Sequence, residues 1–288
     1  MGNLVKLIYS SQCPCKYLEN WSATICGLPH LRKLRLEGSI PGDLWQLESL
    51  ERLSLRTVEI RHFPDSICRL KHLKLLEIRQ CWFIERLPED ICRIERLEEL
   101  VLEECTSLRD IPDSICKMKC LKFLSLIGCV KVEELPRKLG CLECLEKLVL
   151  KQCISLRDIP NSICEMQCLK YLDLSDCHQV VKLPEELGRL ECLEELHLTN
   201  CVSLRHIPNS ICKMKTLLYL NLQFCTFVGK LPEELGCLEC LKELNIEGVG
   251  ITRLPQSIYQ LNGLRIIGFR EQLEVCGFTS FTKTSLVI

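Results

Sequence analysis

Residues 97–120 read LEELVLEECTSLRDIPDSICKMKC, and the same pattern returns every 23 or 24 residues along most of the chain. Leu100 and Leu102 stand two apart, which is the period of a β-strand with both leucines on one side. Residues 113–118 have helical spacing, and Pro112 before them suits a helix's first turn. One strand and one helical turn cannot bury these leucines alone, so neighbouring units must share a core.

Ten prolines mark the repeat along the chain: Pro41, Pro64, Pro88, Pro112, Pro136, Pro160, Pro184, Pro208, Pro232 and Pro255. The unit Leu-x-x-Leu-x-Leu-x-x-Cys, followed by (Leu/Ile)-Pro-x-x-(Leu/Ile), matches the leucine-rich repeat at its usual length. We therefore predict an α/β fold, a leucine-rich-repeat solenoid (horseshoe) with a parallel inner β-sheet and short helical or 3-10 turns on the convex side. About ten repeats should fill residues 26–270, between an N-terminal cap at 1–25 and a C-terminal cap or tail at 271–288.

A longer period is superimposed on the repeat. Ile-Pro-(Asp/Asn)-Ser-Ile-Cys occurs at Pro112, Pro160 and Pro208, and Leu-Pro-x-x-Leu-Gly occurs between them. Residues of roughly 102–246 therefore resemble a duplicated 48-residue pair of repeats.

Charge and hydropathy exclude several classes of protein. The chain has 37 Lys+Arg against 38 Asp+Glu and no basic or acidic run, so we expect neither a nucleic-acid partner nor an anionic membrane surface. No apolar run approaches the roughly 18 residues of a membrane span. Residues 1–10 are too short and too interrupted for a secretory signal, so we expect a cytoplasmic protein.

The 23 cysteines fall mostly into three series with repeat spacing. The first runs from Cys81 to Cys225 just after each strand, the second includes Cys116, and the third includes Cys144. Free cysteine behaves as a small, commonly buried hydrophobe, so we predict buried, reduced thiols. Disulfides are disfavoured by the odd count and missing signal, and zinc by the four repeats that separate Cys141-x-x-Cys144 from Cys237-x-x-Cys240. Redox sensing by thiols in the irregular ends stays open, at Cys13, Cys15 or Cys276. We expect no metal and no cofactor.

The concave surface is the expected binding face, because alternate strand residues point away from the core. Phe123, Tyr171 and Tyr219 recur on every second strand, about 10 Å apart, and aromatic residues favour binding surfaces. The alternative is that the duplication merely copied one aromatic residue. The candidate partner-binding residues are Phe123, Tyr171, Tyr219, Asp173, His197, Asn221, Glu99, Lys147, Glu195 and Arg79.

A catalytic arrangement is the remaining possibility for the same face. Asp173 and His197 share one strand position on adjacent strands, and Ser125 lies at that position two strands away. Such residues can support nucleophilic catalysis. An open sheet provides no water-excluding pocket or oxyanion hole, however, so we predict that the protein is not an enzyme.

The block Cys105-Thr106-Ser107-Leu108-Arg109-Asp110-Ile111-Pro112, repeated from Cys153 and from Cys201, carries a family resemblance. It resembles the repeats of plant intracellular nucleotide-binding leucine-rich-repeat disease-resistance proteins, and the Leu-Pro-Glu-Glu-Leu-Gly repeats are similar to those of the coiled-coil helper class. The resemblance covers roughly residues 26–270. It implies a protein-recognition domain in plant defence, which senses an effector or holds an immune receptor inactive. The preceding nucleotide-binding domain of that family is missing from this sequence.

The resemblance implies a protein partner: a pathogen effector, a host guardee or the receptor's own nucleotide-binding domain. Two alternatives stay open. Gly38-Ser39-Ile40-Pro41 and residues 229–232 echo the repeat of extracellular plant receptor ectodomains, against which the missing signal and the cysteines count. A free-standing cytosolic signalling adaptor is the other.

Overall fold

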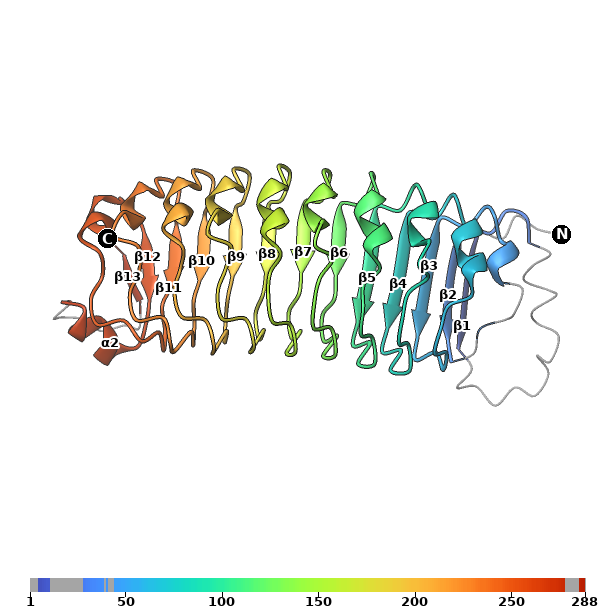
Figure 1. Cartoon of the computed structure of the whole chain (residues 1–288), viewed down its shortest axis with the longest axis horizontal. Coiled ribbons are helices and arrows are strands. Elements are labelled where there is room, and N and C mark those ends of the chain that lie inside the picture. The colour runs from blue at the N-terminus through green and yellow to red at the C-terminus, as the bar shows by residue number, and fades with distance from the viewer. Residues whose placement is uncertain (1–4, 11–27, 39, 41–43, 278–284, 288) are drawn as a thin grey trace.

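The computed structural model describes residues 5–10, 28–38, 40, 44–277 and 285–287. The described chain forms a coil in which each turn contains a strand, and the turns are stacked side by side from the N-terminal to the C-terminal end (Figure 1). All strands belong to one sheet in chain order, and those from β1 to β12 are parallel. The predicted leucine-rich-repeat solenoid is confirmed.

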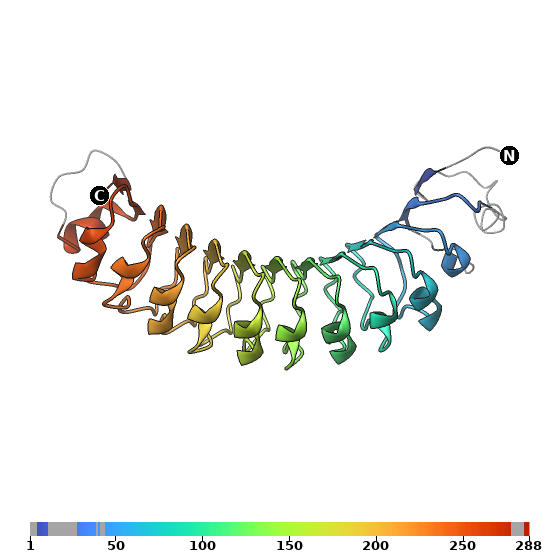
Figure 2. The same cartoon turned by 90° about the horizontal axis from the view of Figure 1, so that it is seen from above.

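The strands form the inner surface of an open arc, and the 3-10 helices lie on its outer surface (Figure 2). The strands are β1 Lys6–Ser10, β2 Lys33–Glu37, β3 Arg52–Arg56, β4 Leu75–Arg79, β5 Glu99–Glu103, β6 Phe123–Ser125, β7 Lys147–Val149, β8 Tyr171–Asp173, β9 Glu195–His197, β10 Tyr219–Asn221, β11 Glu243–Asn245, β12 Arg265–Ile267 and β13 Ser285–Val287. The helices are η1 Leu44–Gln46, η2 Asp65–Arg69, η3 Ile91–Arg93, η4 Asp113–Lys117, η5 Leu139–Cys141, η6 Asn161–Glu165, η7 Leu187–Arg189, η8 Asn209–Lys213, η9 Leu235–Cys237, η10 Gln256–Gln260 and α2 Arg270–Val275.

The two ends of the sheet differ from the central repeats. Lys6–Ser10, inside the range expected to be a cap, forms β1 and pairs with β2 in parallel. At the other end β13 pairs antiparallel with β12, and α2 buries Leu273 against the last repeat. The strands β1 and β13 are thus the two edge strands of the sheet.

The core is a continuous strip of leucines because every strand places the same position inward. Leu100, Leu124, Leu148, Leu172 and Leu196 are fully buried and lie opposite one another across the strands. The prolines of the repeat precede the 3-10 helices rather than lying inside them, by one residue at Pro112, Pro160 and Pro208 and by three residues at Pro136, Pro184 and Pro232. For example, the Pro112 carbonyl accepts a hydrogen bond from Ile115 N at 3.0 Å.

The 48-residue period has a structural cause on the convex side. The backbone N–H of Gly188 donates to Ser210 Oγ at 3.0 Å, and Gly140 and Gly236 bond Ser162 and Ser257 in the same way. A Cβ atom added at Gly188 would lie 1.8 Å from the Ser210 carbonyl oxygen. The Gly repeat and the following Ser repeat therefore form a closely packed pair.

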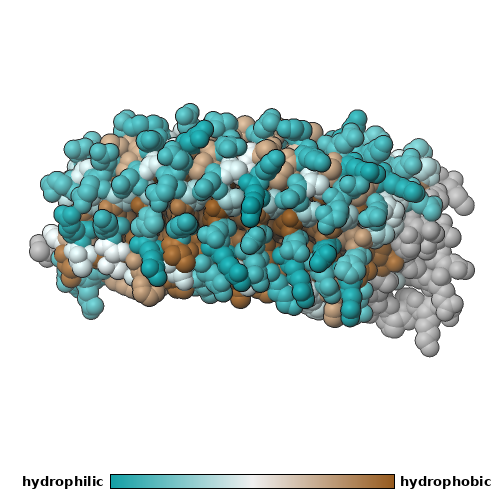
Figure 3. All heavy atoms as spheres, in the orientation of Figure 1, coloured by the Kyte–Doolittle hydropathy of each residue, from teal (hydrophilic) through white to brown (hydrophobic). Residues whose placement is uncertain are grey.

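On the convex side, clefts separate one closely packed pair of repeats from the next. Clefts with volumes of about 860, 370 and 320 Å³ lie between η4 and η5, between η6 and η7, and beside η8. This face is mostly hydrophilic, with hydrophobic side chains in a recessed strip along its middle (Figure 3). Every helix in the described part of the chain is too short or too polar to cross a membrane.

Candidate functional site

The centre of the concave face carries five side chains from β6 to β9 that contact one another. Lys147 Nζ lies 4.0 Å from the ring centroid of Tyr171 and 5.8 Å from that of Phe123. The Tyr171 and His197 rings are 5.0 Å apart, and His197 Nε2 is 3.0 Å from Glu195 Oε2. We call Phe123, Lys147, Tyr171, Glu195 and His197 the central cluster. It joins a cation to aromatic faces, an arrangement that is itself stabilising.

The rings of the central cluster are half-buried rather than fully exposed. Burial, followed by the nearby carboxylates of Asp173 and Glu195, raises the pKa of Tyr171 to about 12, so its hydroxyl stays neutral. Tyr219, on β10, is 37% exposed and is the most accessible of the three predicted aromatic residues. The central cluster thus presents aromatic rings that are held in place by their neighbours, with polar side chains around them.

Two predicted contact residues, Asp173 and Asn221, accept hydrogen bonds from the backbone of their own repeat. Asp173 is 8% exposed, and its Oδ1 accepts a hydrogen bond from Ser175 N at 2.8 Å. Asn221 accepts one from Gln223 N at 3.0 Å in the same way. Asp and Asn commonly bond their own backbone two residues on, so this signal was present in the sequence. Asp173 therefore has little surface to offer a partner.

The structure does not assemble the considered catalytic arrangement. Asp173 and His197 are opposite each other in the register of β8 and β9, as predicted. His197, however, contacts Tyr171 and Glu195, and Ser125 is fully buried. Among the described residues no group of three potential ligands is placed to hold a metal ion.

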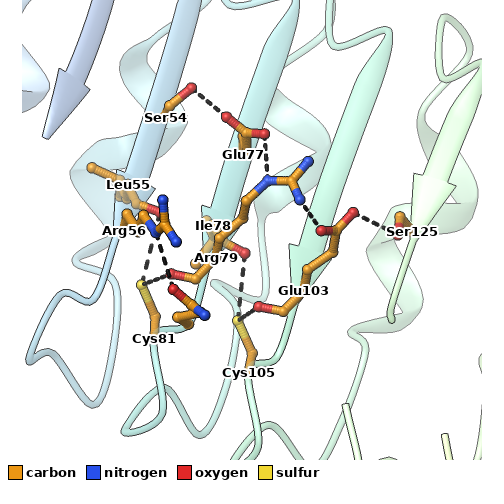
Figure 4. A network of polar contacts seen from close by, with 11 residues as sticks. Ser54, Leu55, Arg56, Glu77, Ile78, Arg79, Cys81, Glu103, Cys105 and Ser125 are labelled. Carbon is orange, nitrogen blue, oxygen red and sulfur yellow. Dashed lines mark hydrogen bonds and ion pairs between the residues drawn. The ribbon is translucent and has the colours of Figure 1, made fainter. Parts of the chain in front are cut away.

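Arg79 belongs to a polar network that crosses β3 to β6 (Figure 4). Ser54 donates to Glu77 at 2.6 Å, Arg79 donates to Glu77 at 2.6 Å and also to Glu103, and Ser125 Oγ lies 3.5 Å from Glu103. Burial opposes the charge of Arg79, but its bonds and attraction to both carboxylates outweigh burial and raise the Arg79 pKa. The Arg79 side chain is thus already bound by its neighbours. Glu99, another predicted contact residue, is half-buried on β5.

A group of basic residues at the N-terminal end of the concave face was missed by sequence reasoning. Lys33, Arg35 and Arg52 are exposed on β2 and β3, and Lys6 lies beside Lys33 on β1. We call these four residues the basic end. The signal was the alternation of Lys33-x-Arg35 within one strand, which puts both charges on the same face.

Exposed aromatic residues at the turn side of the C-terminal repeats were also missed. Phe227 is 70% exposed, and the rings of Phe224 and Phe269 lie 6.3 Å apart. Phe224 has a φ of 59°, which costs an L-residue roughly 1–2 kcal/mol. A Cβ atom at Gly248 would lie 2.5 Å from the Phe224 ring, so this glycine makes room for it.

The predicted burial of the cysteines is right for the first series and for the second except half-buried Cys92, and it is wrong for the third. The first series is buried, and its thiols donate to carbonyls of the preceding repeat, for example Cys177 Sγ to Leu150 O at 3.2 Å. The third is exposed because it lies in the turn before each strand: Cys120, Cys144, Cys168, Cys192 and Cys240. Cys276, suggested as an exposed thiol, is buried, whereas Cys13 and Cys15 lie outside the described residues.

The buried thiols predict a loss of stability at high pH. Burial raises the pKa of Cys177 from 9.0 to about 12, so this thiol stabilises the folded state below pH 9 and loses that effect as the pH rises towards 12. Between pH 8 and about 10.5 its share of the lost unfolding free energy should be about 2 kcal/mol. Urea unfolding of Cys177→Ala should show a correspondingly shallower pH dependence than the wild type. Cys168→Ala, which removes an exposed thiol of the same repeat, is the control, and equal slopes in the wild type and Cys177→Ala would contradict the prediction.

Known proteins share the leucine-rich repeat. A family model described as "Leucine-rich repeat region" matches residues 101–207, and one described as "Leucine Rich Repeat" matches residues 216–238. No curated protein sequence matches the chain.

Three solved structures illustrate the structural likeness. A TDR receptor has a TM-score of 0.67 and 27% identity over 85% of this chain and 44% of its own. The Arabidopsis receptor kinase HAESA, in complex with the peptide hormone IDA and the co-receptor SERK1, has a TM-score of 0.57 and 24% identity over 93% of this chain and 42% of its own. The functional domain of InlJ from Listeria monocytogenes, which includes a cysteine ladder, has a TM-score of 0.50 and 16% identity over 85% of this chain and 59% of its own.

The chain spans less than half the length of either receptor structure. The family models, the parallel sheet and these likenesses agree on one conclusion. The protein is a leucine-rich-repeat solenoid, a fold of protein-interaction modules that are generally not enzymes.

Proposed function

We propose that this chain recognises a protein partner along its concave face, with the central cluster as the main anchor. The observation that carries the proposal is the position of Lys147 between the rings of Phe123 and Tyr171. Aromatic residues at the centre of an interface contribute much of its binding energy. Because these residues stand on strands of one rigid sheet, little side-chain freedom is lost on binding.

The basic end supplies a second contact and indicates the charge of the partner. Lys33, Arg35 and Arg52 are exposed on two adjacent strands, whereas Arg79 further along the face is bound by two glutamates. An acidic segment of the partner would complement these cations. Opposite charges mainly raise the association rate, and salt weakens that effect.

The biological setting that we propose is plant defence signalling in the cytosol. The chain would act as part of an immune receptor, or as a relative of one, by sensing a pathogen effector or host guardee or by contacting a nucleotide-binding domain. The similarity of its 48-residue pattern to disease-resistance proteins supports this setting. Seven cysteines of the described part of the chain are exposed, which also favours a reducing compartment, where free thiols persist.

A receptor-type ectodomain is the second candidate function. It is favoured by the 27% identity to a TDR receptor over 85% of this chain. In that case the same concave surface would bind a peptide or protein outside the cell. A free-standing cytosolic adaptor would use the same surface as well, so the partner's identity and compartment distinguish the three.

The binding test uses proximity labelling in plant cells with the wild type and the double variant Phe123→Ala/Tyr171→Ala. We expect a defined set of partners to be labelled by the wild type and lost in the double variant. With a purified partner from that set, loss of the anchor should weaken the Kd by about 30-fold, which corresponds to about 2 kcal/mol.

Tyr259→Ala is the matched control, because Tyr259 is an exposed aromatic residue on the convex helix η10. It should label the same partners as the wild type. An unchanged partner set and an unchanged Kd in the double variant would overturn the concave-face proposal. Partners from the cell surface instead of the cytosol would select the receptor-type ectodomain.

A further inference from the structure

Four exposed cysteines occupy the same position in four successive repeats. Cys120, Cys144, Cys168 and Cys192 are exposed and stand two residues before Lys122, Glu146, Lys170 and Glu194. Those four residues are linked by backbone hydrogen bonds of 2.8 Å from each N–H to the carbonyl one repeat earlier. Neighbouring cysteines are therefore about one strand spacing apart, roughly 4.8 Å. We call these four residues the thiol row.

The residue that follows the thiol row shows where side chains at this position lie. Thr216 replaces cysteine in the next repeat, and its Oγ1 is 2.7 Å from the Glu191 carbonyl oxygen and 2.9 Å from that of Leu193. These carbonyls flank Cys192. The Thr216 side chain therefore leans onto the equivalent turn of the preceding repeat, beside Cys192.

The spacing of the row suits a covalent link. Disulfides join cysteines whose Cα atoms are usually 4.4–6.8 Å apart, and parallel stacking places each adjacent pair within that range. By contrast, Cys240 has Thr216 on one side and Gly263 on the other at the same position, so it has no such neighbour.

Lysine and glutamate side chains lie around the middle of the row, where Lys119, Lys122 and Lys170 form ion pairs with Glu143, Glu98 and Glu146. The pKa of Lys119 is raised mainly by its hydrogen bond to Glu143, and in smaller part by the negative charges that Cys141 and Cys144 would carry. The pKa of Lys122 is raised by Glu98, then by Glu146 and least by Cys144, and that of Lys170 by Glu146, then by Glu194 and least by Cys168. The thiolate is the nucleophile in thiol oxidation, and the exposure of these thiols gives an oxidant access to them.

We propose that the thiol row is a peroxide-responsive modification site in which disulfides link neighbouring repeats, beginning with Cys144 and Cys168. The Cys144 thiolate attacks one oxygen of hydrogen peroxide, the O–O bond breaks, and a sulfenic acid and hydroxide form. The Cys168 thiol then attacks this sulfur, the S–S bond forms, and water leaves. Two thiols are oxidised and one peroxide is reduced; after proton uptake by the hydroxide, two waters are the products.

The test treats the reduced full chain with hydrogen peroxide under native conditions, alkylates the remaining thiols and maps linked peptides by mass spectrometry. We expect peptides joined between adjacent row members, each with a loss of about 2 Da for the two hydrogens removed. Cys144→Ser should abolish both links to that position and leave Cys168–Cys192. Thr216→Cys should extend the row and bring Cys240 into a link.

Cys237-x-x-Cys240 is the matched control for Cys141-x-x-Cys144, because it has the same spacing within one repeat but no row neighbour. Links confined to Cys141–Cys144 and Cys237–Cys240 would overturn the proposal. So would the absence of links between repeats after peroxide treatment, or a failure of Thr216→Cys to recruit Cys240. None of these results depends on the concave face or its partner.

Discussion

Gly188→Ala should lower the free energy of unfolding by about 3 kcal/mol, as overpacking of a closely packed site typically costs 1–3 kcal/mol or more. The added Cβ would lie 1.8 Å from the carbonyl oxygen of Ser210 and 2.5 Å from its carbonyl carbon. These are backbone atoms, so relief requires η7 and η8 to move apart rather than a side chain to rotate. Urea unfolding followed by circular dichroism measures the effect.

Gly229→Ala is the control for Gly188→Ala, because no atom lies within 4 Å of a Cβ added at Gly229. It should change the stability by only a few tenths of a kcal/mol. Ser210→Ala separates the hydrogen bond from the close approach: losing the Oγ that Gly188 N bonds at 3.0 Å should cost about 1 kcal/mol. Equal stabilities of Gly188→Ala and the wild type would contradict the close pairing of these repeats.

Leu172→Ala should destabilise the solenoid by about 2–5 kcal/mol, the usual range for truncating a buried leucine. Leu172 is fully buried in the middle of the leucine strip, opposite Leu148 and Leu196. Because each repeat is stabilised mainly by its neighbours, the cavity should weaken the contacts of both adjoining repeats. The measurement is again urea unfolding, with binding to the identified partner measured in buffer.

Tyr171→Ala is the control for Leu172→Ala, because the two residues are neighbours in strand β8. Tyr171 faces the concave surface, so its truncation should weaken partner binding more than it lowers stability. Leu172→Ala should do the reverse, provided that the variant is folded at the temperature of the assay. If both variants changed stability and binding in equal proportion, the two residues would not face opposite sides of β8 in the way described.

The opposite behaviour expected of Tyr171 and Leu172 could be predicted from the sequence because it depends on local period alone. A strand alternates its side chains, and the repeat fixes which phase is inward. For the same reason the sequence predicted the parallel sheet, the outer 3-10 turns and the burial of Cys177. Each of these depends on one repeat and on a neighbour of nearly the same sequence.

Contacts between side chains of different repeats required the tertiary structure. The sequence placed Phe123, Lys147 and Tyr171 on successive strands, but the insertion of the ammonium between the rings depends on side-chain rotamers. The basic end was missed because the first repeats are irregular: Lys33 and Arg52 face each other although only 19 residues separate them.

What the sequence by itself determined is therefore the architecture, since a period of 23 or 24 residues repeats the same local preferences and the same buried leucines along the chain. The tertiary structure alone decided which residues at equivalent positions of the repeat are free to contact a partner or an oxidant. In the tertiary structure Asp173 accepts a hydrogen bond from its own backbone, Arg79 is bound by two glutamates, and Cys120, Cys144, Cys168 and Cys192 are exposed in a row. The physical reason is that the burial and pairing of a side chain depend on the distance between neighbouring repeats. The spacing of the strands sets this distance, and the sequence of a single repeat does not contain it.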